Sequence, residues 1–163
     1  MIQSHKRGRR DEPLAAGWWE PAVPTPRVRL GAKALLWADD RVLLVRERRA
    51  DGSTFWTLPG GGIRAGESPT DCLRRELAEE LHGRVAVRQP VTTCSYRHRS
   101  DPRLTTMYVV FAGRLTDPPV PAWQEGVIDA RWVAPEDPPE TTLAPFRRVL
   151  RRVGSRDREL PGR

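Results

Sequence analysis

Cysteine and long hydrophobic runs are both scarce in this sequence. Its 163 residues contain two cysteines, Cys72 and Cys94, whose spacing fits neither a disulfide framework nor a zinc site. No run of eighteen apolar residues occurs, and the first residues lack the apolar segment of a secretion signal. We therefore expect no membrane partner and a cytoplasmic protein.

Lysine is scarce as well, because Lys6 and Lys33 are the only two in the chain. Arginine therefore supplies almost all of the net charge of +7, and arginine favours bidentate contact with phosphate. Much of this charge lies near the two ends, where the alternatives are a solvated tail and a nonspecific nucleic-acid contact. The usual phosphate-loop motifs are missing, since no G-x-G-x-x-G opens a helix and no Gly-Lys-Ser/Thr occurs.

Three glutamates, Glu76, Glu79 and Glu80, stand at helical spacing in the middle of the chain. On one face of a helix, neighbouring like charges cost about 0.2–0.5 kcal/mol per pair. The simplest way to offset this repulsion is a divalent cation such as Mg²⁺, which takes oxygen ligands. The alternative is an ordinary solvated helix with mixed charges. We favour the metal because of the glycine-rich loop that precedes the helix.

The helix that carries these glutamates has a well-marked start. Ser68 can cap its first turn, and Pro69 suits its first position. Gly83 offers a stop. A row of leucines at intervals of four predicts that one side packs on a core, and its members are Leu73, Leu77 and Leu81.

The loop before the helix, residues 59–67, contains four glycines and follows a strand-like segment at residues 55–58. Glycine allows positive φ angles and close approach of other groups to the main chain. Strand, glycine turn and capped helix would bring exposed backbone groups next to the acidic face. A plain flexible loop is the alternative for any cluster of glycines.

Loop and helix together resemble the signature of the Nudix hydrolase family. That signature is a Gly, five residues, Glu, seven residues, Arg-Glu, an aliphatic residue, any residue, Glu-Glu, any residue, Gly and an aliphatic residue. The residues that match it are Gly61, Glu67, Arg75, Glu76, Leu77, Glu79 and Glu80. His82 stands at the family's glycine place and Gly83 at its aliphatic place, as though the helix stop had moved by one residue. Residues 56–62 and 130–133 also look like the family.

The resemblance implies an α/β fold of the Nudix type, an α/β/α sandwich with a mixed β-sheet. It also implies Mg²⁺-dependent hydrolysis, with Mn²⁺ as a substitute, of a pyrophosphate linkage in a nucleoside diphosphate derivative, by attack of water on phosphorus. By similarity the metal ligands are Glu76, Glu79, Glu80 and the backbone carbonyl of Gly60, with Glu67 supporting the site.

Two catalytic roles follow from the same resemblance. Arg75 would orient the carboxylates, and its spacing allows a side-chain pair with Glu79. The general base is open, since the family takes it from the helix, here Glu79, or from a later loop, here Glu125. The alternative for Glu125 is a solvated loop acid.

Residues outside the signature suggest a substrate surface but no substrate subclass. A basic cluster, which contains Arg97, Arg99 and Arg103, could reach terminal phosphates, while Trp123 and Tyr96 could stack on a base. The alternatives are solvated loop residues and, for Tyr96, a place in the core.

We expect one domain at residues 27–153, between a basic, proline-containing and partly disordered arm at 1–26 and a tail at 154–163. Residues 28–37 and 41–48 predict a hairpin. Further strands are expected at 55–58, 85–87, 91–97, 104–115 and 130–133. A final amphipathic helix is expected at 143–153.

Three functions remain open at this stage. The first is a pyrophosphohydrolase acting on a small phosphate-bearing molecule. The second is an RNA 5'-end pyrophosphohydrolase or RNA-binding relative, whose binding would weaken steeply with salt. The third is a non-catalytic, nucleotide-binding regulatory domain, although such a binder would not need three clustered carboxylates. Dimers are common in the resembling family, so a homodimer is also open.

Overall fold

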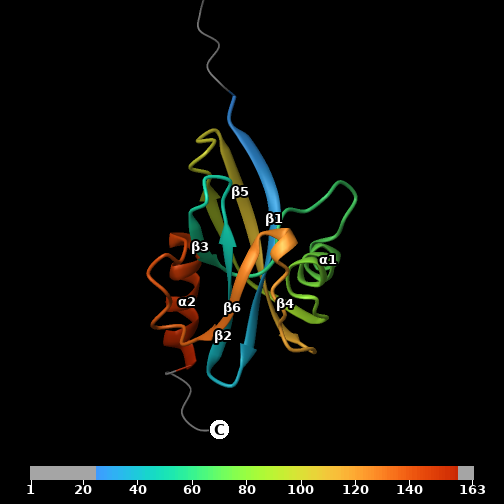
Figure 1. The fold of residues 1–163 in the computed structure, drawn as a ribbon, viewed down its shortest axis with the longest axis vertical. Helices are drawn as coiled ribbons and strands as arrows, with labels where there is room; N and C mark the ends of the chain where they lie inside the picture. Colours follow the sequence, from blue (N-terminus) through green and yellow to red (C-terminus); the bar gives the residue numbers. More distant parts are fainter. Residues whose placement is uncertain (1–24, 158–163) are drawn as a thin grey trace, which may run out of the picture.

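The computed structural model describes residues 25–157, which form a sheet between two helices (Figure 1). The sheet order is β3-β2-β1-β5-β4, with β6 paired to β2. The strands are β1 (Arg27–Ala38), β2 (Arg41–Arg48), β3 (Thr54–Thr57), β4 (Val85–Arg97), β5 (Leu104–Leu115) and β6 (Val127–Val133). The helices are α1 (Pro69–Leu81), η1 (Trp123–Glu125) and α2 (Ala144–Asp157). Because β1 and β5 are parallel and the other pairs antiparallel, the predicted α/β/α sandwich with a mixed sheet is confirmed.

Alternate residues of the central strands pack on opposite helices, as the period of two in a strand requires. In β1, Ala34 and Leu36 belong to the cluster that contains Leu77 of α1. Leu35, between them, belongs to the cluster that contains Phe146 of α2. The sheet therefore has two buried faces and two hydrophobic cores.

The predicted hairpin is present, but its two strands pair only beside the turn. Trp37 pairs with Val42, and Asp39 in the turn has a φ of 52°. Beyond that point β1 pairs with β5 instead. The glycine-rich loop enters the gap, where the Ala32 nitrogen donates to the Gly61 carbonyl at 2.9 Å. The divergence of β1 and β2 thus gives the loop its place.

Three elements depart from the prediction by more than one residue. β4 is one strand and not two segments, with register shifts on either side of Pro90. A proline is tolerated there because β4 is an edge strand, and edge strands do not need every N–H donor. β6 begins at Val127, three residues earlier than expected, and α2 runs to Asp157.

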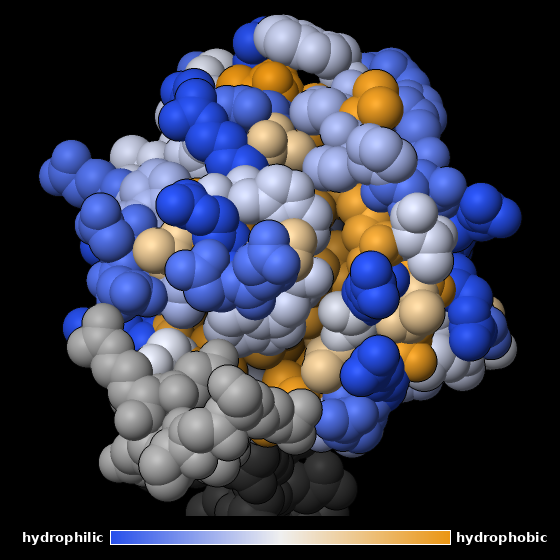
Figure 2. Space-filling view, turned by 90° about the horizontal axis from the view of Figure 1, so that it is seen from below, coloured by the Kyte–Doolittle hydropathy of each residue, from blue (hydrophilic) through white to orange (hydrophobic). Residues whose placement is uncertain are grey.

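From below, most of the described surface is hydrophilic, with hydrophobic residues showing mainly in the gaps between polar ones (Figure 2). Among the helices at residues 25–157, none is long and apolar enough to cross a membrane. Most of the expected arm, residues 1–24, and the end of the expected tail, residues 158–163, lie outside the described residues.

Candidate active site

The glycine-rich loop is clamped between β1 and α1. Gly60 has a φ of 117°, and a Cβ at this position would collide with the carbonyl oxygen of Ala32. A Cβ at Gly61 would lie 2.5 Å from the carboxyl carbon of Glu76. Only glycine fits both places, since no other residue combines this backbone freedom with so little volume. The main chain of the loop therefore meets the acidic face of α1 directly.

Both ends of α1 are capped. The Asp71 nitrogen donates to the Ser68 hydroxyl at 3.1 Å, as predicted from the sequence. At the other end His82, with a φ of 49°, takes the left-handed position, and its N–H bonds to the Leu77 carbonyl. The interpretation that the helix stop had moved to Gly83 is therefore wrong: a histidine fills the glycine place and adopts the conformation that glycine favours.

Arg75 gathers three of the glutamates. It binds both carboxylate oxygens of Glu67, with Nε–Oε1 at 2.7 Å and Nη2–Oε2 at 2.9 Å. Its Nη1 lies 2.7 Å from Glu76 and 3.0 Å from Glu79, so the pair expected from the spacing is formed. This guanidinium lowers the pKa of the Glu67 carboxyl to about 2.

Glu80 lies apart from this cluster and is 8% exposed. Its Oε2 accepts a hydrogen bond from the Gly60 nitrogen at 2.9 Å. Burial raises the pKa of the Glu80 carboxyl to about 8, while the charge of Lys33 acts in the opposite direction. A buried carboxylate that lacks full compensation is a favourable place for a cation.

Lys33 of β1 supplies the nearest positive charge. It is 4% exposed, and its ammonium group donates to the Gly60 carbonyl and lies 3.9 Å from Glu47 Oε1. Burial alone would lower the pKa of this amine, but the charges of Glu47, Glu80 and other neighbours raise it above its usual value. Lys33 is therefore a charged side chain inside the protein.

The groups expected to hold a metal have the oxygen ligands that Mg²⁺ prefers. They are carboxylates and the Gly60 carbonyl, which already accepts a hydrogen bond from the Lys33 ammonium group. In the described part of the chain, no group of three or more histidine, cysteine, aspartate or glutamate side chains is placed to share one ion. The reason is visible in the contacts, because Arg75 holds Glu76 and Glu79 whereas Glu80 binds the Gly60 nitrogen. Glu76 and Glu80 nevertheless both reach the Gly60–Gly61 backbone.

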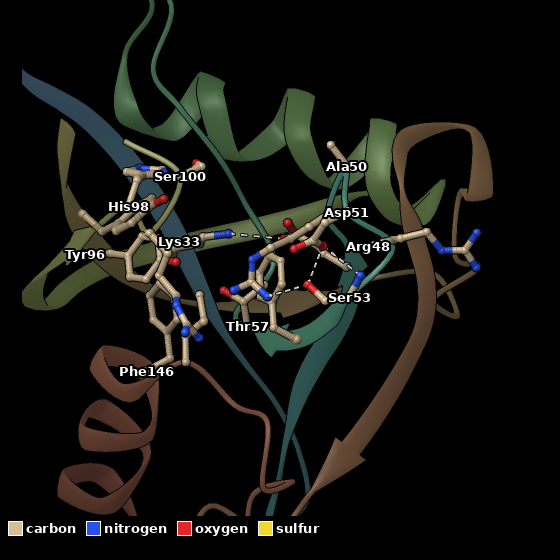
Figure 3. Close-up of a pocket in the computed structure, with 16 residues that line it drawn as sticks. Lys33, Arg48, Ala50, Asp51, Ser53, Thr57, Tyr96, His98, Ser100 and Phe146 are labelled. Atoms are coloured by element: carbon tan, nitrogen blue, oxygen red, sulfur yellow. Dashed lines mark hydrogen bonds and ion pairs between the residues drawn. The ribbon is translucent and has the colours of Figure 1, made fainter. Parts of the chain in front are cut away.

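Lys33, which binds the Gly60 carbonyl, also lines a cavity of about 780 Å³ (Figure 3). Figure 3 shows Lys33 reaching into it, with Tyr96 and His98 on one side and Asp51 and Ser53 on the other. Aromatic rings line much of the wall and belong to Phe55, Tyr96, Tyr108 and Phe146. Cationic side chains line it too, and these are Lys33, Arg48, Arg49 and Arg99.

Of the substrate residues expected from the sequence, Arg99 lines this cavity and three do not. Arg97 is exposed, and the Arg103 Nε lies 3.3 Å from Asp101. Trp123 is 65% exposed, and the guanidinium of Arg48 lies 5.9 Å from the centroid of its ring. Tyr96, the other expected stacking residue, does line the cavity.

Sequence reasoning missed most of the cavity wall. Lys33, Tyr108 and Phe146 come from β1, β5 and the start of α2, so no local spacing connects them. One signal was available, because a lone lysine inside the apolar run of a predicted strand is unusual.

Glu125, the loop candidate for the general base, is exposed at the end of η1. The segment before it is tied to the acidic helix, since the Ala122 nitrogen donates to the backbone carbonyl of Glu80 at 2.9 Å. η1 is therefore anchored at the C-terminal end of α1. Glu79, the helix candidate, is half-buried within the Arg75 cluster.

Comparison with known proteins agrees with this architecture. Residues 27–153 match the model of the NUDIX domain. A MutT Nudix hydrolase from Burkholderia pseudomallei is 25% identical, with a TM-score of 0.65 over 78% of this chain and 98% of that one. A MutT protein from Methanosarcina mazei Go1 is 22% identical, with a TM-score of 0.69 over 85% of this chain and 100% of that one.

A sequence relative gives a narrower match. An RNA pyrophosphohydrolase from Bartonella clarridgeiae is 47% identical over 45 residues, which is 28% of this chain and 26% of that protein. The match thus spans about a quarter of that relative's length. The NUDIX match covers most of the chain, and the fold agrees with it: this chain belongs to the Nudix hydrolase family, whose members are pyrophosphatases acting on acid anhydrides.

Proposed function

We propose that this chain hydrolyses the pyrophosphate linkage of a nucleoside diphosphate derivative, by attack of water on phosphorus. The observation that carries this proposal is a chain of contacts that links the cavity wall to the acidic helix through Gly60. Lys33, which lines the 780 Å³ cavity, binds the Gly60 carbonyl, and the Gly60 nitrogen binds Glu80 of the acidic helix. A substrate with an aromatic group in the cavity would place its phosphates beside the helix.

The cavity suits the nucleoside part of such a substrate. Its volume lies in the usual range for small-molecule sites, and its aromatic rings can stack on a base. The Arg49 guanidinium lies 4.1 Å from the ring centroid of Phe55, so one wall already presents a cation on an aromatic face. Arg48 and Arg99 add positive charge for phosphate oxygens.

The acidic helix suits the phosphate part. Glu76, Glu79, Glu80 and the Gly60 carbonyl are the groups that would hold Mg²⁺, which neutralises phosphate charge and lowers the pKa of a bound water. Arg75 would keep Glu76 and Glu79 in place between turnovers. Glu79 and Glu125 are the candidates for the general base.

An RNA 5' end is the second candidate substrate, and the local likeness to an RNA pyrophosphohydrolase favours it. Arg97 and Arg103 carry exposed cationic side chains that could follow a phosphate backbone. This candidate predicts a steep loss of binding with salt, whereas a small nucleotide would show a weaker dependence.

The test is a turnover assay on a panel of substrates. Purified chain with Mg²⁺ or Mn²⁺ would be incubated with nucleoside triphosphates, nucleotide sugars, dinucleotides, and capped or triphosphorylated RNA, and phosphate-bearing products would be measured. The Glu80→Gln variant is the control for contaminating enzymes. We expect metal-dependent hydrolysis of at least one pyrophosphate compound, and no turnover of any member would overturn the proposal.

A further inference from the structure

Lys33 is the only lysine in the described residues, where every other permanently charged cation is an arginine. It is also a buried cation, at 4% exposure. Its ammonium group lies over two aromatic rings, with Nζ 5.6 Å from the Tyr108 centroid and 5.7 Å from the Phe146 centroid. Lysine carries a compact charge on a flexible stem, unlike the planar fork of arginine, so its ammonium group can change partners with a small movement.

The present partners of Lys33 come from the Gly60 loop, the cavity wall and α1. The ammonium group binds the Gly60 carbonyl and lies 3.9 Å from Glu47, which also lines the cavity. Glu80 and Glu76 of α1 interact with the ammonium group through their charges. Lys33 therefore acts as the local counter-ion of this cluster.

A divalent ion on the Gly60 carbonyl and these carboxylates would take over that role. The ammonium group would then lose its carbonyl acceptor and face a like charge. The cavity is where it can go, because Lys33 already forms part of the cavity wall. A phosphate group at the inner end of the cavity would supply a new acceptor.

We infer that Lys33 is a substrate-positioning residue that exchanges partners: without metal it binds the Gly60 carbonyl, and with metal it binds the substrate phosphate nearest the aromatic cavity. This inference rests on the proposed function, since it concerns the same substrate. It assigns to Lys33 the phosphate that is attached directly to the group held in the cavity. Orientation of the substrate would then depend on a residue outside the Nudix signature.

The scarcity of lysine makes a direct measurement possible. Full-length chain carrying ¹³C at lysine Cε would give two lysine signals by NMR, from Lys6 and Lys33. The spectrum of Lys33→Met assigns them. Mg²⁺ alone would be added first, and α,β-methylene ADP, which resists hydrolysis between its phosphates, second. We expect the Lys33 signal to shift at both steps while the Lys6 signal stays in place.

Variants distinguish a positioning role of Lys33 from a merely structural one. In Lys33→Met we expect several-fold tighter Mn²⁺ binding, because a competitor for the Gly60 carbonyl is gone, and about tenfold weaker binding of α,β-methylene ADP in Mg²⁺. General damage to the fold would weaken both. Arg49→Met is the matched control, since Arg49 lines the same cavity and stacks on Phe55: its Mn²⁺ affinity should equal that of the unmodified chain.

The outcomes separate this inference from the proposed function. A Lys33 signal that fails to move at either step overturns the inference, even if the chain hydrolyses a nucleotide. Equal weakening of Mn²⁺ and ligand binding in Lys33→Met also overturns it. If Lys33 responds at both steps while no pyrophosphate compound is hydrolysed, the partner exchange stands and the proposed hydrolysis fails.

Discussion

Arg75 binds Glu67 through two parallel hydrogen bonds, Nε–Oε1 at 2.7 Å and Nη2–Oε2 at 2.9 Å, and both side chains are largely buried. The remaining nitrogen, Nη1, reaches Glu76 and Glu79. One arginine thus keeps together acids that would otherwise repel each other. Bidentate, charge-assisted bonds of this kind are among the stronger polar interactions in proteins.

Replacing Arg75 by methionine should lower the free energy of unfolding by about 2 kcal/mol, because Glu67 loses a charged partner inside a crowded site. Thermal denaturation in EDTA measures the loss. Arg74→Met is the matched control, since Arg74 pairs with Asp71 at 2.7 Å on the exposed side of α1. That variant should lose less than about 1 kcal/mol. Equal losses would mean that the Arg75 cluster is no stronger than a surface ion pair.

Glu80 should lower the stability of the metal-free protein as pH rises from about 5 to about 8. Burial raises the pKa of Glu80 from 4.5 to about 8, so the folded chain keeps a proton that the unfolded chain releases in this window. Denaturation in EDTA across this range measures the slope. Glu67 and Asp117, whose pKa values are lowered to about 2, contribute only below about pH 5.

The control for this pH dependence is Glu80→Gln, which removes the titrating group but keeps an oxygen for the Gly60 nitrogen. Its slope between pH 5 and 8 should be less negative than that of the unmodified chain. Burial lowers the pKa of His98, which makes stability rise with pH in the same window, but His98 is present in both proteins. Equal slopes of the two proteins would contradict the assignment.

His82→Gly should stabilise the protein by about 1 kcal/mol. A left-handed conformation is costly for a residue with a Cβ, and His82 has a φ of 49° at the end of α1. Denaturant unfolding at pH 7 measures the gain. His82→Ala keeps the Cβ and should show no comparable gain, so similar stabilities of the two variants would show that the backbone conformation is not the cause.

Glu80→Gln should also reduce kcat/KM by about 100-fold or more, because loss of a charged metal ligand removes several kcal/mol of stabilisation of the developing phosphate charge. Steady-state kinetics on the preferred substrate, with denaturation data for the same variant, separate this loss from unfolding. A folded variant with nearly full activity would remove Glu80 from the metal site.

Glu79→Gln and Glu125→Gln distinguish the two candidates for the general base. Loss of the base should lower kcat by about 10²–10⁴ and remove the acidic limb of the pH–rate profile. The other variant should keep that limb. If both variants keep it, the base lies elsewhere in the chain.

Local chemistry made α1 and its loop predictable from the sequence. The cap at Ser68 and the leucine row depend on residues a few positions apart, so the sequence contains the needed information. The same holds for the Arg75–Glu79 pair. Pro90 misled the strand prediction, because a proline in sequence looks like a break although an edge strand tolerates it.

Long-range pairing made the cavity unpredictable. β1 and β5 are parallel neighbours, with Lys33 opposite Val110 and Gly31 opposite Tyr108. No pattern along the chain shows that these strands meet, and α2 brings Phe146 from a third region. The placement of Glu80 apart from Glu76 and Glu79 was equally hidden, because it depends on where the loop backbone meets the helix.

Binding of Mn²⁺ to the metal-free chain, measured by calorimetry beside turnover of the preferred substrate, tests the central claim most directly. We expect the unmodified chain to bind Mn²⁺ and to hydrolyse substrate only in its presence. The Glu76→Gln/Glu80→Gln double variant should remain folded and lose both properties. Turnover in excess EDTA, or undiminished Mn²⁺ binding by the folded double variant, would contradict a metal site on α1.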